Sequence, residues 1–383
     1  MAIDEHPLLC LPARCLRAFD RGQHIDDAQT AGPVEMRRLR AFLLAATVAL
    51  APTGEPAVAQ QAMINAGAWS AYKAKFLDAS GRIVDNGNGN ISHSEGQGYG
   101  LLLAYLAANP ADFEQIWYFT RTELLLRDDG LAVWKWDPNV KPHVADTNNA
   151  TDGDMLIAYA LALAGTAWKR NDYILAASRM AQALLAETVA SSQGRTLLLP
   201  GTQGFTGSDR DDGPVVNPSY WIYEAIPVMS ALAPSDAWKK LSDDGVELLN
   251  GMQFGPRRLP AEWVSLRDKP RPAKGFDAEF SYNAIRIPLY LARGGITDKA
   301  LLIRLQKGMS QDGVPATIDL TTGRPKTLLP DPGYRIVNDV VACVVDGTKL
   351  PSSALQFAPA LYYPSTLQLL GLAYIGEKHP ECL

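Results

Sequence analysis

The sequence predicts an all-α protein whose helices are arranged in pairs around a closed ring. Stretches that are apolar on nearly every side alternate with amphipathic stretches, which is typical of buried helices that alternate with surface helices. The polar starts of the buried stretches, near residues 95, 152, 219 and 282, recur at intervals expected of a two-helix repeat with long loops. No sustained strand-type alternation is present, so we expect only short strands within the loops.

The apolar stretches are the expected inner helices and the amphipathic stretches are the expected outer helices. The inner candidates are residues 68–77, 98–107, 154–164, 220–232, 282–292 and 365–375. The outer candidates are residues 111–126, 173–188, 237–253 and 299–309. About six pairs fit into residues 60–383 without a linker, which predicts a single domain. A closed toroid is favoured over an open solenoid, because an open array would need polar capping repeats at its ends.

The region before residue 60 has the features of a secretory signal peptide. Residues 36–40 include three arginines, residues 41–50 form an apolar run too short to span a bilayer, and residues 57–59 are small, as at a cleavage site. We therefore expect a signal peptide over residues 36–59 that is removed before Gln60. The mature protein would then be periplasmic or secreted.

Residues 1–35 are polar, mixed in charge and without periodicity. We expect them to be an upstream extension that is either non-native or disordered, with Met36 as the true start. An unusually long signal peptide that begins at Met1 is the alternative. No other segment reaches membrane-spanning length, so we expect no membrane span in the mature chain.

Composition and charge exclude several classes of protein. Hydrophobic residues make up 47% of the chain, which is enough for a large core. The net charge of −5 argues against binding to nucleic acid or to an anionic membrane, because such proteins are normally basic. The sequence has no histidine or cysteine spacing typical of a metal site, no phosphate-binding loop and no nucleophile elbow, so we expect neither metal nor cofactor.

Two of the four cysteines lie beyond the expected signal peptide. Cys10 and Cys15 precede it, whereas Cys343 and Cys382 belong to the mature chain. An oxidising compartment would permit a disulfide between the latter two that ties down the C-terminus. The sequence leaves pairing and free thiols equally open.

Each expected inner helix begins with a cluster of polar residues. The inner helices of a toroid run parallel, so their N-termini lie on one face of the ring. We therefore expect a set of side chains from these clusters to converge on that face. The set is Glu95, Asp152, Tyr220, Trp221, Tyr282, Asn283 and Arg286, with Asn149 in the second cluster as a further contact.

Glu95 follows Ser94, which with Gln97 forms a capping-box pattern. Ser94 is therefore the expected N-cap and Glu95 the first helical residue. An acid at this position is commonly no more than a favourable partner of the helix dipole. The recurrence of polar clusters at the other helix starts favours a shared site instead.

Aromatic residues accompany these polar clusters. Trp134 and Trp136 alternate beside a polar loop, where they either fill the core or form an exposed platform. Carboxylates and flat rings, without metal or phosphate motifs, are typical of a polysaccharide site. Cleavage of a glycosidic bond requires an acid that protonates the leaving oxygen and a second group at the anomeric carbon.

Two motifs resemble the signatures of glycoside hydrolase family 8, namely residues 93–100 (HSEGQGYG) and 150–154 (ATDGD). Trp134-Lys-Trp, Asn217-Pro-Ser-Tyr-Trp and Tyr282-Asn-Ala-Ile-Arg follow in the order of that family, and the resemblance covers residues 60–383. Within the family, the chain is most similar to the endo-β-1,4-glucanases encoded with bacterial cellulose synthase. The resemblance implies an (α/α)6 barrel of six inner and six outer helices, an inverting mechanism and a cellulose substrate. It also implies the cellulose export machinery as a partner.

By motif, Glu95 resembles the proton donor of the family and Asp152 the acid beside the sugar that is cleaved. Asp154 is expected to cap or pack. The substrate contacts implied are Trp134, Trp136, Asn149, Tyr220, Trp221, Tyr282, Asn283 and Arg286. Because a proton donor must stay protonated, we expect aromatic burial and Asp152 to raise the pKa of Glu95 against the helix dipole.

The chain departs from the family at Asn283, where many members carry the aspartate that serves as general base. An amide cannot accept a proton from water. The candidate replacements in the sequence are Asp277, Glu279, Asp211, Asp212 and Asp152.

Two alternative functions remain open on the sequence alone. The substrate could be chitosan, xylan or mixed-linkage glucan; acidic loops at residues 146–154 and 209–212 would suit the amines of chitosan. The other alternative is a glucan-binding protein that does not hydrolyse its ligand. Asn283 suggests it, because an amide cannot act as the general base.

Overall fold

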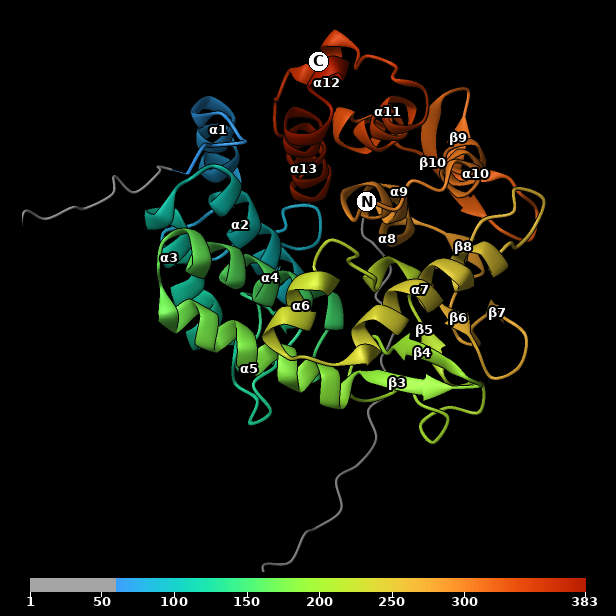
Figure 1. Cartoon of the computed structure of the whole chain (residues 1–383), viewed down its shortest axis with the longest axis horizontal. Coiled ribbons are helices and arrows are strands. Elements are labelled where there is room, and N and C mark those ends of the chain that lie inside the picture. Colours follow the sequence, from blue (N-terminus) through green and yellow to red (C-terminus); the bar gives the residue numbers. More distant parts are fainter. Residues whose placement is uncertain (1–59) are drawn as a thin grey trace, which may run out of the picture. The chain divides into compact units, whose positions relative to one another are not determined.

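The computed structural model describes residues 60–383, in which helices predominate (Figure 1). The predictions for residues 1–35 and 36–59 lie outside the described residues. The helices are α1 (Ala66–Phe76), α2 (Ser94–Leu106), α3 (Pro110–Phe119), α4 (Thr151–Ala167), α5 (Asn171–Glu187), α6 (Ile226–Leu232), α7 (Asp236–Gly251), α8 (Tyr282–Ile285), α9 (Ile287–Arg293), α10 (Lys299–Met309), α11 (Pro332–Asp346), α12 (Ser352–Leu355) and α13 (Tyr362–Lys378). A π-helical turn over Thr120–Leu124 extends α3.

The strands are short and lie in the loops, as predicted. They are β1 (Ser92–His93), β2 (Lys135–Trp136), β3 (Val189–Ser192), β4 (Arg195–Leu198), β5 (Val215–Val216), β6 (Val264–Ser265), β7 (Arg271–Pro272), β8 (Glu279–Phe280), β9 (Ser310–Gln311), β10 (Val314–Asp319) and β11 (Pro325–Leu328). All pair antiparallel, in the orders β1-β2, β3-β4, β5-β6-β7 and β11-β10-β8, with β9 also on β10.

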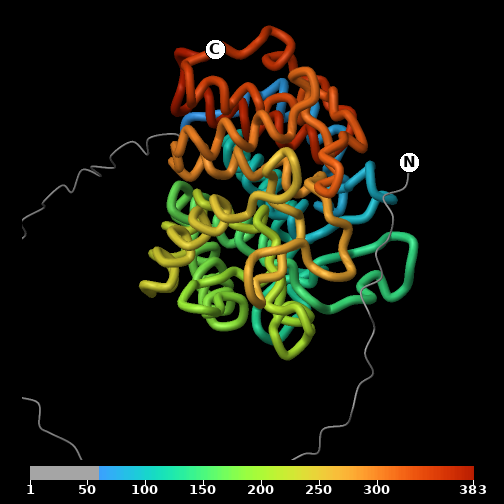
Figure 2. The backbone as a smooth tube through the Cα atoms, turned by 90° about the vertical axis from the view of Figure 1, so that its right-hand side faces the viewer, coloured from blue at the N-terminus to red at the C-terminus, as the bar shows by residue number. Residues whose placement is uncertain are grey.

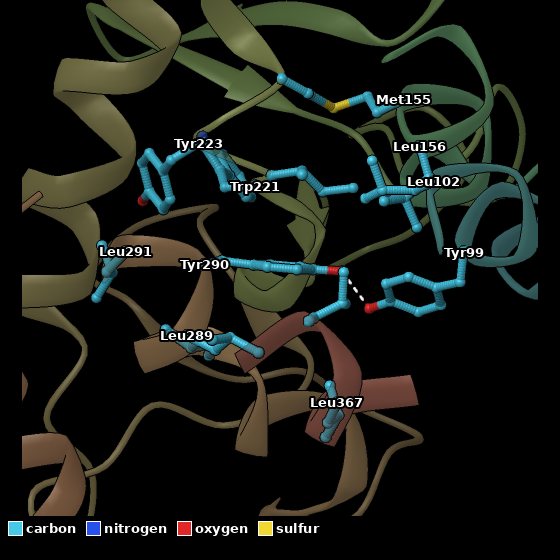
Figure 3. Close-up of a cluster of buried hydrophobic side chains, with 14 of the residues drawn as sticks. Tyr99, Leu102, Met155, Leu156, Trp221, Tyr223, Leu289, Tyr290, Leu291 and Leu367 are labelled. Carbon is cyan, nitrogen blue, oxygen red and sulfur yellow. Dashed lines mark hydrogen bonds between the residues drawn. The ribbon is translucent and has the colours of Figure 1, made fainter. Parts of the chain in front are cut away.

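Buried helices alternate with surface helices, as the sequence predicts. Helices α2, α4, α9 and α13 are buried along most of their length, whereas α5, α7 and α10 bury one face. Helices α1 and α6, predicted as inner helices, also bury only part of their residues. The buried helices supply most of one shared core, in which the hydroxyls of Tyr99 and Tyr290 also hydrogen-bond (Figure 3). Among residues 60–383, no helix is long and apolar enough to cross a membrane.

The first and last described helices meet, which closes the ring. Both α1 and α2 contact α13. The hydroxyls of Tyr72 and Thr366 are 2.9 Å apart, and the Asn86 side chain accepts a hydrogen bond from the Tyr362 backbone. In Figures 1 and 2 the blue N-terminal helices lie beside the red C-terminal ones. The arrangement is therefore a closed toroid.

Two of the predicted inner helices are shorter than expected. Residues 218–225 form a 3-10 turn and a loop before α6, because the Asn217 side chain accepts hydrogen bonds from the backbone and hydroxyl of Ser219. The predicted helix 282–292 is interrupted at Arg286, which ends α8 and precedes α9. Pro288, lacking an N–H, cannot continue the hydrogen bonds of α8 and instead fits the first turn of α9.

Helix α11 was not predicted. Asp331 caps this helix and Pro332 is its first residue, which are ordinary start signals. The valine-rich helix that follows has weak intrinsic helix propensity, since β-branched side chains lose rotamer freedom in a helix. Packing against α13 stabilises it.

A disulfide joins Cys343 of α11 to Cys382 near the C-terminus, across 39 residues. Both cysteines are buried. Because the bond restricts the unfolded chain, its loss in a Cys343→Ala/Cys382→Ala variant is expected to lower the free energy of unfolding by about 3–4 kcal/mol. Urea denaturation with and without reductant measures this. Equal stability of the oxidised wild type and the variant would contradict the prediction.

Candidate active site

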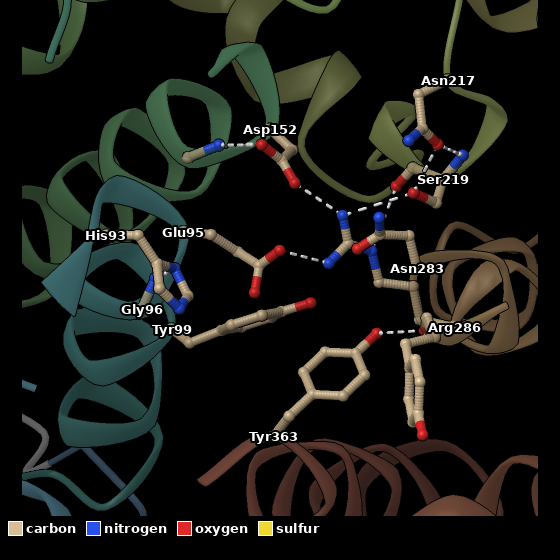
Figure 4. Close-up of polar contacts among 12 residues, drawn as sticks. His93, Glu95, Gly96, Tyr99, Asp152, Asn217, Ser219, Asn283, Arg286 and Tyr363 are labelled. Atoms are coloured by element: carbon tan, nitrogen blue, oxygen red, sulfur yellow. Dashed lines mark hydrogen bonds and ion pairs between the residues drawn. The ribbon is translucent and has the colours of Figure 1, made fainter. Parts of the chain in front are cut away.

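Arg286 binds both acids that the sequence analysis singled out (Figure 4). Its Nη1 lies 2.5 Å from Glu95 Oε2, and its Nη2 lies 2.5 Å from Asp152 Oδ2. The Arg286 side chain is fully buried, that of Asp152 is 2% exposed and that of Glu95 is 15% exposed. One guanidinium thus holds two carboxylates together, with Glu95 the more accessible.

Glu95 is held in the first turn of α2, but the capping prediction was wrong. His93, not Ser94, is the N-cap: its Nδ1 accepts the Gly96 N–H at 3.0 Å. Ser94 Oγ is buried without a hydrogen-bond partner in residues 60–383. Gln97 accepts from the backbone of Ile83 instead of completing a capping box.

The two acids meet because glycines let the starts of α2 and α4 touch. A Cβ on Gly98 would lie 2.5 Å from Leu156 Cβ. A Cβ on Gly153 would lie 2.1 Å from Ser94 Oγ and 2.7 Å from the backbone nitrogen of Glu95. Since real Cβ atoms do not approach so closely, only glycine permits this spacing at position 153.

A Gly153→Ala variant is therefore expected to displace Glu95 and to lower kcat about a hundredfold. It should also lower the free energy of unfolding by about 1–3 kcal/mol, as overpacking does. Gly165→Ala is a matched control, because Gly165 lies in the same helix, α4, but near its other end, where a Cβ would crowd Ile174 of α5 and not Glu95. Kinetics and denaturation of both variants test this. Equal loss of kcat in the control would contradict a positional effect on Glu95.

Arg286 is fixed by further contacts. Its Nε donates to the Ser219 carbonyl at 3.3 Å and its Nη2 to Ser219 Oγ at 3.4 Å. The rings of Tyr220 and Tyr290 lie 5.9 and 5.5 Å from the guanidinium carbon. The prediction that Arg286 contacts substrate is therefore corrected: the side chain is buried and bonded to the two acids.

Three predicted residues lie near Arg286, either in the chain or in space. Tyr220 lies beside Arg286 and makes an edge contact with Trp263, with ring centroids 6.2 Å apart. Asn283 is the second residue of α8 and lies near Arg286 in Figure 4. The carbonyl of Tyr282 accepts a hydrogen bond from the Tyr363 hydroxyl at 3.1 Å. All three residues are partly exposed, so they remain proposed substrate contacts.

Two predicted substrate contacts belong to the interior instead. Trp221 is 2% exposed, and its Nε1 donates to the Leu241 carbonyl in α7. It lies on the loop before α6, so its side chain turns into the core (Figure 3). Asn149 is buried too, with Nδ2 donating to Asp154 and Oδ1 accepting from the Thr202 backbone.

Trp134 and Trp136 flank the start of α2 and are each partly exposed. Strand β2 pairs with β1, placing Trp136 opposite Ser92, two residues before Ser94. Trp134 Nε1 donates to Asp146 at 2.8 Å. The Trp136 ring stacks on His143 at 4.3 Å, so part of its surface serves packing. Both remain proposed substrate contacts.

The other candidate general bases lie in different surroundings from the acid pair. They are Asp211, Asp212, Asp277 and Glu279. Asp277 and Glu279 both pair with Lys326, at 3.7 and 2.6 Å. Asp212 is buried and bound to Arg210 and to the Lys274 backbone, whereas Asp211 is exposed. Within residues 60–383, none of the four is hydrogen-bonded or ion-paired to Glu95, Asp152 or Arg286.

Comparison with known proteins agrees with this arrangement. The family model for glycosyl hydrolases family 8 matches residues 43–377. The chain belongs to glycosyl hydrolase family 8. It is 36% identical over 339 residues to a protein described as a probable endoglucanase of Novacetimonas hansenii, covering 86% of this chain and 94% of that one.

Solved structures of family 8 hydrolases share the fold. Endoglucanase Cel10 from Klebsiella pneumoniae superposes with a TM-score of 0.74 at 34% identity, covering 82% of this chain and all of that one. The endo-β-1,4-glucanase CMCax from Acetobacter xylinum gives 0.72 at 35% identity, with coverage of 81% and 97%. The predicted (α/α)6 barrel is thereby confirmed.

The two acids of this family 8 hydrolase differ in proton affinity. Burial raises the pKa of Asp152 to about 7, although Arg286 opposes the rise. Burial also acts to raise the pKa of Glu95, but Arg286 and His93 outweigh it and hold that pKa below its usual value. The expectation of a raised pKa for Glu95 was wrong, because the charges of Arg286 and His93 together outweigh the effect of burial on this carboxyl.

The pair should nevertheless retain one proton up to about pH 7, since coupled acids titrate together. The kcat/KM of the wild type is therefore expected to fall as pH rises through about 7. In Asp152→Asn the descending limb should move to lower pH, because Glu95 alone is held by Arg286 with a lowered pKa. Values of kcat/KM for carboxymethyl-cellulose hydrolysis, measured across pH 4–9, locate this fall in each variant.

Asp154→Asn provides the control for this pH prediction. Asp154 is buried and its pKa is also raised to about 7, mainly by burial. Its oxygens accept from the Ala132 backbone and from Asn149, however, and not from Arg286. The descending limb should stay in place in this variant. A limb that is unmoved in Asp152→Asn would contradict the coupling.

Three residues of the site were not predicted: Ser219 and Tyr363, described above, and Glu262. Glu262 precedes Trp263 and β6, and its Oε1 accepts the Asn283 N–H at 2.7 Å. Its adjacency to a tryptophan was the only local signal. No recognisable motif contains it, because its role depends on a contact with a residue far along the chain.

Proposed function

We propose that this protein is an endo-acting β-1,4-glucanase that cleaves cellulose-type chains with inversion at the anomeric carbon. The observation that carries the proposal is the pair of carboxylates, Glu95 and Asp152, joined by one buried arginine at the starts of two inner helices. Similarity to proteins described as endoglucanases supports the substrate class.

In this mechanism Glu95 donates a proton to the leaving glycosidic oxygen. It is the more exposed of the two acids, as a group that meets the substrate must be. Sugar binding would exclude water from Glu95 and so raise its proton affinity toward that of Asp152. Asp152 holds the hydroxyls of the distorted sugar ring, and a separate base activates water on the opposite face.

The biological setting is proposed from the N-terminal sequence and from the resemblance to glucanases encoded with cellulose synthase. Export through the signal peptide at residues 36–59 would deliver the enzyme to the periplasm or beyond. There it would trim β-1,4-glucan as the export machinery releases it. Trp134, Trp136, Tyr220, Tyr282 and Asn283 are the proposed sugar contacts.

Hydrolysis of carboxymethyl-cellulose tests the function. We expect a rapid fall in viscosity with slower release of reducing ends, as endo-cleavage produces, and an initial α-anomer detected by NMR. Chitosan, xylan and mixed-linkage glucan serve as competing substrates. Binding of glucan without release of reducing ends would instead indicate a binding protein, and faster cleavage of a competing substrate would overturn the proposed specificity.

A further inference from the structure

Glu262 is a carboxylate beside the site that the steps above do not use. Its Oε1 accepts the backbone N–H of Asn283 at 2.7 Å, and the N–H of Ala284 also stabilises its charge. Asn283 lies one turn before Arg286, whose positive charge also acts on Glu262. Glu262 therefore faces the segment that carries the arginine of the acid pair.

The backbone around Glu262 is held on both sides. Its N–H donates to the Glu279 carbonyl at 3.0 Å, and the next carbonyl, that of Trp263, accepts from Ala273 at 2.9 Å. The Trp263 ring stacks on Phe276 at 4.6 Å and meets the edge of Tyr220. Since Tyr220 lies beside Arg286, Glu262 is fixed relative to the acid pair rather than on a free loop.

We propose that Glu262 is the general base of the reaction, in place of an acid at position 283. The inference rests on the proposed function. One water O–H bond breaks, its proton passes to Glu262, and the water oxygen bonds to the anomeric carbon. The glycosidic carbon–oxygen bond breaks at the same time, and the leaving oxygen takes the proton of Glu95. Exchange with solvent then returns both carboxyls to their starting states.

Glu262 is better suited to this step than its neighbours. The Asn283 amide cannot accept a proton, and Glu279 is ion-paired to Lys326. Within residues 60–383, no lysine or arginine forms an ion pair with Glu262, and its hydrogen bonds come from the backbone N–H groups of α8. Burial raises the pKa of Glu262 to about 7 against the opposing backbone N–H groups, and a base with a pKa near the working pH is effective.

Glu262→Gln separates a catalytic from a structural role, because glutamine can still accept the Asn283 N–H but cannot take a proton. We expect kcat on carboxymethyl-cellulose to fall about a thousandfold. The loss should be equally large on 2,4-dinitrophenyl β-cellobioside, whose leaving group needs no proton. Glu95→Gln should lose far less on that substrate. Glu279→Gln is the matched control and should stay within a few-fold of the wild type.

Azide provides a second readout that a structural defect would not produce. In Glu262→Ala, azide can attack without deprotonation, so it should restore turnover of the dinitrophenyl substrate and yield a cellobiosyl azide of inverted configuration. Thermal unfolding by circular dichroism confirms that each variant is folded. Should Glu262→Gln fold poorly, the azide product in Glu262→Ala still decides the question.

The outcomes distinguish this proposal from the proposed function. If the wild type cleaves β-1,4-glucan and Glu95→Gln does not, but folded Glu262→Gln is as active as Glu279→Gln, Glu262 is not the base and the function stands. Absence of azide rescue in folded Glu262→Ala, or azide product of retained configuration, also overturns it. If the wild type itself fails to cleave β-1,4-glucan, the proposed function falls first.

Discussion

Replacing Glu95 with glutamine is expected to lower kcat on carboxymethyl-cellulose by about a thousandfold, with little change in KM. Glutamine retains the shape of the side chain and an oxygen that can accept from Arg286, but it has no proton to give to a leaving glycosidic oxygen. Because the proton is needed only in the transition state, the loss should appear in kcat rather than in binding. Initial rates of reducing-end release measure it.

The substrate with a dinitrophenyl leaving group is the control for the Glu95→Gln result. The dinitrophenolate group leaves without being protonated, so Glu95→Gln should recover most of its activity on this substrate. Circular dichroism should show an unchanged fold, since the packing of α2 against α4 is untouched. Unchanged release of reducing ends from carboxymethyl-cellulose would contradict the assignment of Glu95 as proton donor.

Replacing Arg286 with methionine is expected to have the largest combined effect. It leaves Glu95 and Asp152 side by side without their shared cation, and removing one partner of a buried ion pair costs about 3–5 kcal/mol of stability. Activity should fall by more than a hundredfold, because both carboxylates lose the guanidinium group that positions them. Steady-state kinetics and urea denaturation measure the two effects.

The stability loss in Arg286→Met should depend on pH in a definite direction. Without the arginine, burial and mutual repulsion raise the pKa values of both acids in the folded state above their unfolded values. A raised folded pKa stabilises the fold at low pH, and this stabilisation is lost as pH rises through that pKa. The difference from the wild type should therefore be larger at pH 8 than at pH 5.

A second buried ion pair provides the matched control. Arg293 of α9 binds Glu224 at 2.7 Å, with both side chains 7% exposed. Arg293→Met should lose similar stability while the folded protein keeps its specific activity. If Arg286→Met were to retain activity per folded molecule, or if Arg293→Met lost it equally, the proposed role of Arg286 in positioning the acids would be wrong.

Local patterns in the chain predicted much of the architecture. The periodicity of residues 173–188, 237–253 and 299–309 matches α5, α7 and α10 within a few residues, because burial of one helix face requires that spacing. The parallel course of the inner helices also sufficed to bring Glu95 and Asp152 to the same end of the ring. Their motifs alone supported the family.

Other features depended on neighbours that local patterns do not record. His93 caps α2, although Ser94 and Gln97 form the expected motif. The Ser94 hydroxyl instead packs against Gly153 at the start of α4. Trp221 looked like part of a site cluster, yet the short turn before α6 directs its ring into the core. Each error arose where a contact between separate elements outweighed a local preference.

By itself, the sequence determined the class of the fold, the helices that would be buried and the two acids at their starts, because hydrophobic periodicity and short motifs encode these locally. Only the tertiary structure decided that Arg286 would join those acids, that burial would raise the pKa of Asp152 and that Glu262 would lie against Asn283. Arg286 is 191 residues from Glu95 and 134 from Asp152. Contacts over such separations are set by how whole helices pack, and the pKa values follow from the burial and charge that this packing creates.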